Sequence, residues 1–264
     1  MQVGVSTWYP ADVTSGLDAD VAAFLARLTT PPTTDRASLY NTLILSLKSA
    51  GVWSKLDALY IFAAADSQAA GLNLVNSNFT CTPFSSPTFT PDRGYAGDGS
   101  TSYVDTNYDT GDSANIKLQR NSATLGVYAN TSTAAADVRE CGSRNFAATT
   151  FGSTSGMSFR SAATNTDTTV TTFANSVAMS ATSRSNVSNH DTYRNGVFVE
   201  TLTRTSVVLS LSHLLVGCFN NNGVPSQFSS RRVACVFAGS SMTSGELLAA
   251  YNAIHTYLVA VGGD

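Results

Sequence analysis

Charged residues are scarce in this chain of 264 residues. Asp, Glu, Lys and Arg together make up 12%, about half of their usual share in globular proteins. The cationic residues are scattered and the formal net charge is −3, so the positive stripe that nucleic-acid binding requires is missing. Ser and Thr replace the charges and account for about a quarter of the chain. Such a hydroxyl-rich surface suits hydrogen bonding to sugars, although abundant Thr is equally typical of a β-rich protein.

Long apolar runs and a secretory leader are also missing. No run approaches about eighteen consecutive apolar residues, so we expect no membrane insertion. The N-terminal residues 1–4 have neither a positive nor an apolar region, so we expect no secretory signal. We therefore expect the protein to remain in the cytoplasm or to leave the cell by lysis or another signal-free route.

The cysteines form no Cys-x-x-Cys pair, which argues against a zinc site. Three of them lie within apolar runs that resemble strands, where a buried free thiol is the usual state, and a disulfide is the alternative. The four residues are Cys81, Cys141, Cys218 and Cys235.

The first section of the chain has the spacing of helices. Ser15–Asp18 resembles a box that starts a helix, and Pro31-Pro32 stops it. A second helix would be capped by Thr34 or Asp35 and would end at Gly51. We assign residues 1–55 to a helical section for attachment or oligomerisation. The apolar run 56–65 fits a buried strand or a buried helix.

From about residue 79 the pattern changes to short alternating runs separated by Gly, Asn and Ser. Asn195-Gly196 is a strong hairpin signal because both residues tolerate positive φ. Many short strands without a helical crossover indicate an antiparallel sandwich. Thr243–Glu246 then forms a capping box before a C-terminal amphipathic helix, which ends at Gly262-Gly263. The expected strands are 103–106, 124–129, 138–142, 156–160, 181–186, 191–194, 197–201, 213–219 and 233–238.

Four segments carry a resemblance to a known family. They are 89–106 (an aromatic, a glycine turn and a Tyr-x-Asp strand), 190–197 (a strand ending at Asn-Gly), 213–223 (a strand and an Asn-rich loop) and 233–261 (a strand, a turn and a helix). Together they resemble the concanavalin A-like lectin/glucanase (LamG-like) jelly roll as found in virion and prophage proteins of tailed phages. The resemblance implies a mainly β fold, an antiparallel jelly-roll β-sandwich with an α-helical N-terminal section and a C-terminal amphipathic helix, with the sandwich and its closing helix over residues 56–264.

The same resemblance implies a function and partners. It implies a virion appendage of the tail-fibre or head-fibre type, made in the host cytoplasm, that binds a host surface polysaccharide and contacts other virion proteins. It also implies a homo-oligomer, with a trimer as the expectation. The alternative is a purely structural decoration or fibre subunit that makes only protein–protein contacts.

Catalytic residues in a usable pattern are missing. Glucanases of this superfamily carry Glu-x-Asp-x-x-Glu on one strand, whereas this chain has only Glu140, Glu200 and Glu246, far apart in sequence. Asp137 and Glu140 would point to opposite faces of a strand. The three histidines belong to no Gly-x-Ser-x-Gly context and phosphate-binding loops are missing, so we expect no enzyme. The histidines are His190, His213 and His255.

The sequence nevertheless offers residues for two kinds of binding site, a calcium site and a sugar site. Asp98, Asp105 and Asp109, with Asp112 nearby, offer oxygen ligands for a structural Ca²⁺, but Asp is also common in turns. No other cofactor is expected. Sugar binding uses an aromatic platform surrounded by hydrogen-bonding side chains on loops. The candidates are Tyr95, Asn107, Tyr108, Asn220, Asn221, Asn222 and Gln227, with Tyr103 as either a platform or a core residue.

Overall fold

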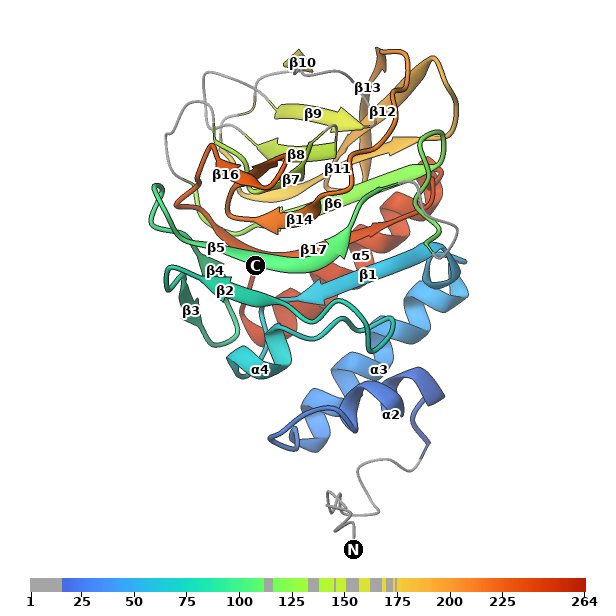
Figure 1. Ribbon diagram of the computed structural model, residues 1–264. Coiled ribbons are helices and arrows are strands. Elements are labelled where there is room, and N and C mark those ends of the chain that lie inside the picture. The colour runs from blue at the N-terminus through green and yellow to red at the C-terminus, as the bar shows by residue number, and fades with distance from the viewer. Residues whose placement is uncertain are drawn as a thin grey trace, which may run out of the picture.

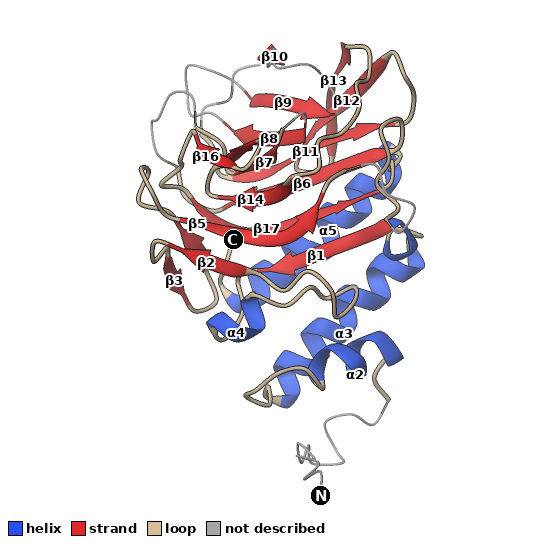
Figure 2. Cartoon of the chain, viewed as in Figure 1, coloured by secondary structure: helices blue, strands red, loops and turns tan. Residues whose placement is uncertain are grey.

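Two antiparallel sheets form the body of the protein, and the helices gather on one side of them (Figures 1 and 2). The computed structural model describes residues 16–111, 116–132, 138–144, 146–150, 157–161, 168–169, 173 and 175–264. The mainly β sandwich with N-terminal helices and a closing C-terminal helix, as the sequence predicts, is confirmed. Between Phe79 and Met242 the described residues contain no helix.

The N-terminal helices begin and end where capping chemistry places them. The Asp18 side chain accepts a hydrogen bond from the backbone of Asp20, and Thr33 does the same for Arg36. Gly51 has a φ of 73°, which stops the second helix as expected. Ser15 of the expected starting box lies outside the described residues. The elements are α2 (Ala19–Leu25), α3 (Thr34–Ser49), the 3₁₀ turn η1 (Trp53–Lys55) and the short α4 (Ser67–Ala70).

The first sheet, sheet A, has the strand order β13-β12-β11-β6-β17-β4-β3, and β1 also pairs with β17. The ambiguous run after residue 55 is a strand in this sheet, buried along its whole length. The strands are β1 (Leu56–Ile61), β3 (Thr88–Thr90), β4 (Gly94–Ala96), β6 (Ala123–Ala129), β11 (Ala178–Arg184), β12 (Asn189–Arg194), β13 (Val197–Thr203) and β17 (Arg232–Gly239).

The second sheet, sheet B, has the order β10-β9-β8-β7-β14-β5-β2, and the β15–β16 hairpin joins it beside β7. The expected strand 213–219 is divided in the structure, because Gly217 has a φ of 82° and turns the chain. The strands are β2 (Thr82–Phe84), β5 (Tyr103–Asp109), β7 (Cys141–Ser143), β8 (Phe146–Thr150), β9 (Met157–Ser161), β10 (Thr168–Thr169), β14 (His213–Val216), β15 (Phe219–Asn221) and β16 (Val224–Ser226).

The central strands of both sheets are covered on both faces, whereas β5, near one edge of sheet B, is covered on one face among the described residues. Every residue of β6 is buried, since one face packs on sheet B and the other on α5 (Ser244–Val261). On the α5 side, the Tyr128 hydroxyl meets His255 Nδ1 at 3.2 Å. In β5 of sheet B, by contrast, buried and half-buried residues alternate strictly. Among the described strands, the outer face of β5 is therefore a part of sheet B that a ligand can reach.

The N-terminal helices pack into the same hydrophobic core as the sandwich. Phe24 of α2 lies against Tyr40 of α3 with ring centroids 4.8 Å apart, and Tyr40 lies 5.2 Å from Tyr257 of α5. These rings and the buried residues of β17 belong to one continuous cluster. The described part of the 1–55 section thus shares the core of residues 56–264.

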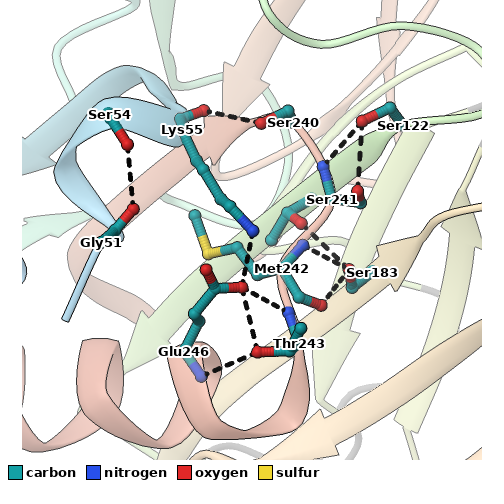
Figure 3. Close-up of polar contacts among 11 residues, drawn as sticks. Gly51, Ser54, Lys55, Ser122, Ser183, Ser240, Ser241, Met242, Thr243 and Glu246 are labelled. Carbon is teal, nitrogen blue, oxygen red and sulfur yellow. Dashed lines mark hydrogen bonds and ion pairs between the residues drawn. The ribbon is translucent and has the colours of Figure 1, made fainter.

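The closing turn between β17 and α5 is held by a dense set of polar contacts (Figure 3). Thr243 and Glu246 form the expected capping box, and Lys55 donates to the Glu246 carboxylate at 2.7 Å. Ser183 of β11 accepts from the Met242 backbone and donates to its carbonyl. These contacts fix η1, β11 and α5 to one another.

The predicted hairpin turn at Asn195-Gly196 is confirmed between β12 and β13. Both residues have positive φ, 49° and 73°, as a two-residue hairpin loop requires. The four cysteines are free thiols. Within the ranges described above, no helix is both long and apolar enough to cross a membrane.

Candidate functional site

The open face of sheet B carries the polar side chains of β5. Val104, Thr106 and Tyr108 point inward and are buried, so the residues between them, including Tyr103 and Asp105, occupy the outer face. Opposite β5 lies β14, with Leu215 in register with Asp105. After β14 the chain turns into the β15–β16 hairpin, and residues of this hairpin lie beside the outer face of β5.

A polar hollow of ≈ 310 Å³ lies between β5, β14 and the β15–β16 hairpin. We call it the sheet B hollow. It is a sizeable, solvent-open space and combines hydroxyl, amide, carboxylate and imidazole groups with a few apolar ones. Its lining consists of Tyr103, Asp105, Leu211, Ser212, His213, Leu215, Asn220, Asn222, Gly223 and Pro225.

Asp105 and His213 form the chemical centre of the hollow. The His213 Nδ1 lies 3.0 Å from Asp105 Oδ2, and the side chains are 44% and 17% exposed. The other carboxylate oxygen of Asp105 accepts from the Asn107 backbone at 2.7 Å, which fixes its orientation. Because a carboxylate accepts hydrogen bonds, Nδ1 of His213 is the donor in this pair, which leaves Nε2 for a ligand.

Two asparagines tie the β15–β16 turn to β14 and to the segment before it. The Asn220 amide donates to the His213 carbonyl at 2.9 Å, and its oxygen accepts from the Gly223 backbone at 2.6 Å. The Asn222 side chain accepts from the Ser210 hydroxyl at 3.1 Å. The wall of the hollow is therefore held in place before any ligand arrives, which lowers the entropic cost of binding.

The structure brings together only part of the predicted sugar site. Asn220 and Asn222 line the hollow with Tyr103. Asn221 is exposed and accepts from Arg144 at 2.8 Å. Asn107 has a φ of 54° and holds β2, since its amide donates to the Thr80 carbonyl at 2.6 Å.

Two predicted aromatic platforms belong to the core. Tyr95 is buried and packs edge-on against Phe62. Tyr108 is completely buried, and its hydroxyl donates to the Asp57 carboxylate at 3.0 Å. Neither ring presents a free face to a ligand. Gln227 has a φ of 53°, and its carbonyl accepts from the Arg139 backbone, so its main chain has a structural role.

The predicted calcium residues lie apart and work as turn and strand partners. Asp98 accepts from the backbones of Ser102, Thr101 and Ser100, and these bonds hold the pKa of its carboxyl well below the ordinary value. Asp109 accepts from the Gly111 backbone at 2.9 Å. Among the residues with described positions, no group of three or more His, Cys, Asp or Glu could hold a metal ion. Asp112 lies outside them.

Glu140 and Glu246 are engaged in structural contacts through their carboxylates. Glu140 pairs with Arg231, and both side chains are fully buried. Glu246 caps α5, as described above, and Glu200 lies on β13 of the other sheet. Asp137 lies outside the described residues. His190 is buried on β12 and meets the Thr182 hydroxyl at 2.8 Å, so it too belongs to the interior.

Sequence reasoning missed His213 as a site residue, along with its partnership with Asp105. The two lie more than a hundred positions apart in the chain, and only the pairing of β14 with β5 brings them together. The usable signal was the alternation of β5, which placed Asp105 on the outer face. Nothing in the sequence indicated which later strand would pair with it.

Comparisons with known proteins show the fold. No family model matches the chain, and no curated protein matches it. Among solved structures, a mutant Trypanosoma rangeli sialidase that displays trans-sialidase activity is 13% identical, with a TM-score of 0.50 over 83% of this chain and 39% of that one. A second structure of Trypanosoma rangeli sialidase, with the inhibitor DANA, is 10% identical, with a TM-score of 0.50 over 81% and 38%. This chain thus spans well under half of the sialidase length.

A smaller structure is also similar. Domain 4 of AbnA, a GH43 extracellular arabinanase from Geobacillus stearothermophilus solved with arabinotriose, is 16% identical, with a TM-score of 0.42 over 74% of this chain and 98% of that domain. At such identities, the sialidase similarity establishes a shared β-sandwich architecture.

Proposed function

We propose that this protein is a non-catalytic carbohydrate-binding β-sandwich that takes a surface glycan into the sheet B hollow. The observation that carries the proposal is the hollow itself, with Asp105 and His213 fixed at its centre. Sugar hydroxyls both donate and accept hydrogen bonds. Asp105 supplies an acceptor, His213 a polar ring nitrogen at Nε2, and the serine and asparagine groups of the wall supply further partners.

The scarcity of charge supports the same proposal. With 12% charged residues in the chain, few ion pairs are available to a ligand, so binding should depend weakly on salt. The lining of the hollow supports the non-catalytic part of the proposal. Of the described residues that line it, Asp105 is the one that carries a carboxylate. Glycoside hydrolysis by the common mechanisms requires two.

We place this activity on a virion, as a tail-fibre or head-fibre appendage that meets a polysaccharide of the host surface. Support comes from the sequence resemblance to virion proteins of tailed phages and from the hydroxyl-rich composition. The N-terminal section would attach the sandwich to other virion proteins, and a homotrimer is the assembly that the resemblance implies.

The test is a panel of purified bacterial surface polysaccharides presented to the wild-type protein, with and without calcium, with product release followed. The proposal expects saturable binding without cleavage. Asp105→Asn removes the carboxylate that orients His213, and should weaken binding about tenfold to a hundredfold, since a hydrogen bond to a charged group is worth about 1.5–3 kcal/mol. Asp35→Asn, the same change at an exposed position on α3, is the control and should bind as wild type. Release of oligosaccharides would contradict the non-catalytic proposal.

A purely structural subunit is the second candidate, and an exposed apolar patch favours it. Val197 and Phe198 on the edge strand β13 are 62% and 48% exposed. Phe198 is in register with Tyr193, whose hydroxyl lies 3.2 Å from the Ser244 hydroxyl of α5, so Phe198 is on the side of the helix, where Leu248 is 43% exposed. Val197 is on the opposite face of β13. A stable oligomer in solution that Phe198→Glu dissociates, together with no binding to any polysaccharide, would favour this function.

A further inference from the structure

A stack of aromatic rings continues the open face of sheet B beyond the hollow. The rings of Phe84 and Tyr103 are parallel to within 9°, with centroids 5.0 Å apart. The Phe228 ring also contacts Tyr103, tilted by 51°, with centroids 6.3 Å apart. We call these three residues the aromatic ledge. Tyr103 also lines the hollow, so the ledge and the hollow are contiguous.

The ledge presents an open ring to solvent. Phe84 lies on β2, the edge strand of sheet B, in register with Tyr103. Its side chain is 41% exposed, and since Tyr103 covers one ring face, the exposed area lies on the other face and the rim. Burying this ring against a ligand would be favourable. The stacking on Tyr103 fixes the orientation of the Phe84 ring, so that a flat apolar group can pack against it.

The edge strand that carries Phe84 is held to β5 by a side chain as well as by backbone pairing. Asn107 of β5 donates its amide to the Thr80 carbonyl at 2.6 Å and to the Thr82 hydroxyl at 3.1 Å. Asn107 adopts a positive φ of 54° in the middle of a strand, which is an unfavourable conformation outside special contacts. Asn107 therefore acts as a positioning residue for the ledge.

We infer that the ligand of the hollow is an extended, internal stretch of a polysaccharide, with one sugar held at Asp105 and His213 and another stacked on Phe84. This inference rests on the proposed function. From the rise along a strand and the spacing between strands, the Cα atoms of Phe84 and Asp105 lie about 8 Å apart. The free face of Phe84 points away from Tyr103, which lines the hollow, so the two sugar positions are further apart than the width of one pyranose ring. A single sugar cannot occupy both positions.

The chemistry of the ledge also restricts the second sugar. The three ledge residues carry no charge, and a sugar stacks on an aromatic ring through the C–H groups of its less polar face. The unit over Phe84 is therefore a neutral sugar with such a face. The unit in the hollow is selected by hydrogen bonding instead.

The experiment compares fragments of different length. Each bacterial polysaccharide of the panel is presented as intact polymer and as size-fractionated monosaccharide, disaccharide and longer fragments to wild type, Phe84→Ala, Phe84→Trp and Phe198→Ala. Phe198→Ala is the matched control, because it removes a phenylalanine of similar exposure from the edge of sheet A. Thermal unfolding verifies that each variant is folded.

We expect affinity to rise with fragment length in wild type and Phe198→Ala. Phe84→Ala should lose that rise, with about tenfold weaker binding of longer fragments and unchanged binding of monosaccharide, and Phe84→Trp should retain it. If Phe84→Ala binds every fragment as wild type does, the inference is overturned while the proposed function stands. If no polysaccharide of the panel binds the wild type, the proposed function and the inference fall together.

Discussion

The buried His190 should make the fold sensitive to mild acid. His190 lies on β12 of sheet A and is only 2% exposed, and its ring contacts the Thr182 hydroxyl. Burial lowers the pKa of His190 to about 3, with Arg184 and Arg204 adding repulsion. Native His190 therefore stays neutral at a pH where the same residue in the unfolded chain is protonated.

The sign and size of the effect follow from proton linkage. Above the ordinary histidine pKa of about 6.5, neither state takes the proton and stability is unaffected. As the pH falls from there toward about 3, the unfolded chain alone binds the proton, so the free energy of unfolding decreases. At about pH 4.5 the loss is about 3 kcal/mol, at about 1.4 kcal/mol for each pH unit below 6.5.

The variant His190→Asn isolates this contribution. An asparagine amide can replace Nδ1 in the contact with Thr182, but it does not titrate. Urea unfolding of both proteins near pH 7 and near pH 4.5, followed by circular dichroism, gives two differences in the free energy of unfolding. The wild type should lose about 3 kcal/mol more than the variant between these pH values. Parallel losses in both proteins would refute a neutral, buried His190, whatever the stability of the variant at neutral pH.

Three further predictions concern residues that sequence or geometry single out. Glu140→Gln should lower the free energy of unfolding by about 3–5 kcal/mol, because it removes the buried carboxylate that pairs with Arg231. Denaturant titration measures the free energy of unfolding, and an unchanged value would contradict the prediction. Thr243→Ala should cost about 1 kcal/mol by removing the cap of α5, a loss that thermal unfolding detects, whereas an unchanged melting temperature would argue against the cap. Cys141 and Cys235 should react with a thiol reagent only on unfolding, because burial raises the pKa of both thiols; rapid labelling of the native protein would be inconsistent with their burial.

Local signals made the elements predictable from the sequence. Asn195-Gly196 and the box from Thr243 to Glu246 act through their immediate neighbours, so their geometry follows from residue type alone. The run beginning at Leu56 was ambiguous because a fully buried strand has no alternation, and only its pairing with β17 settles it.

The candidate site was less predictable because it depends on contacts across the sheet. Asn220 and Asn222 could be selected as loop residues, and both line the hollow. Tyr108 lay beyond the strand expected over residues 103–106, so its burial, which follows from the greater length of β5 and from its contact with Asp57, could not be predicted. The pairing of Asp105 with His213 likewise exists only once β14 lies beside β5.

The most direct test of the account is a crystal structure of the protein with an oligosaccharide that the polysaccharide panel retains. The account predicts a sugar in the sheet B hollow, with hydroxyl groups within hydrogen-bonding distance of Asp105 and His213. An oligosaccharide bound on the helical side, or at the edge of β13 with the hollow free of sugar, would contradict it.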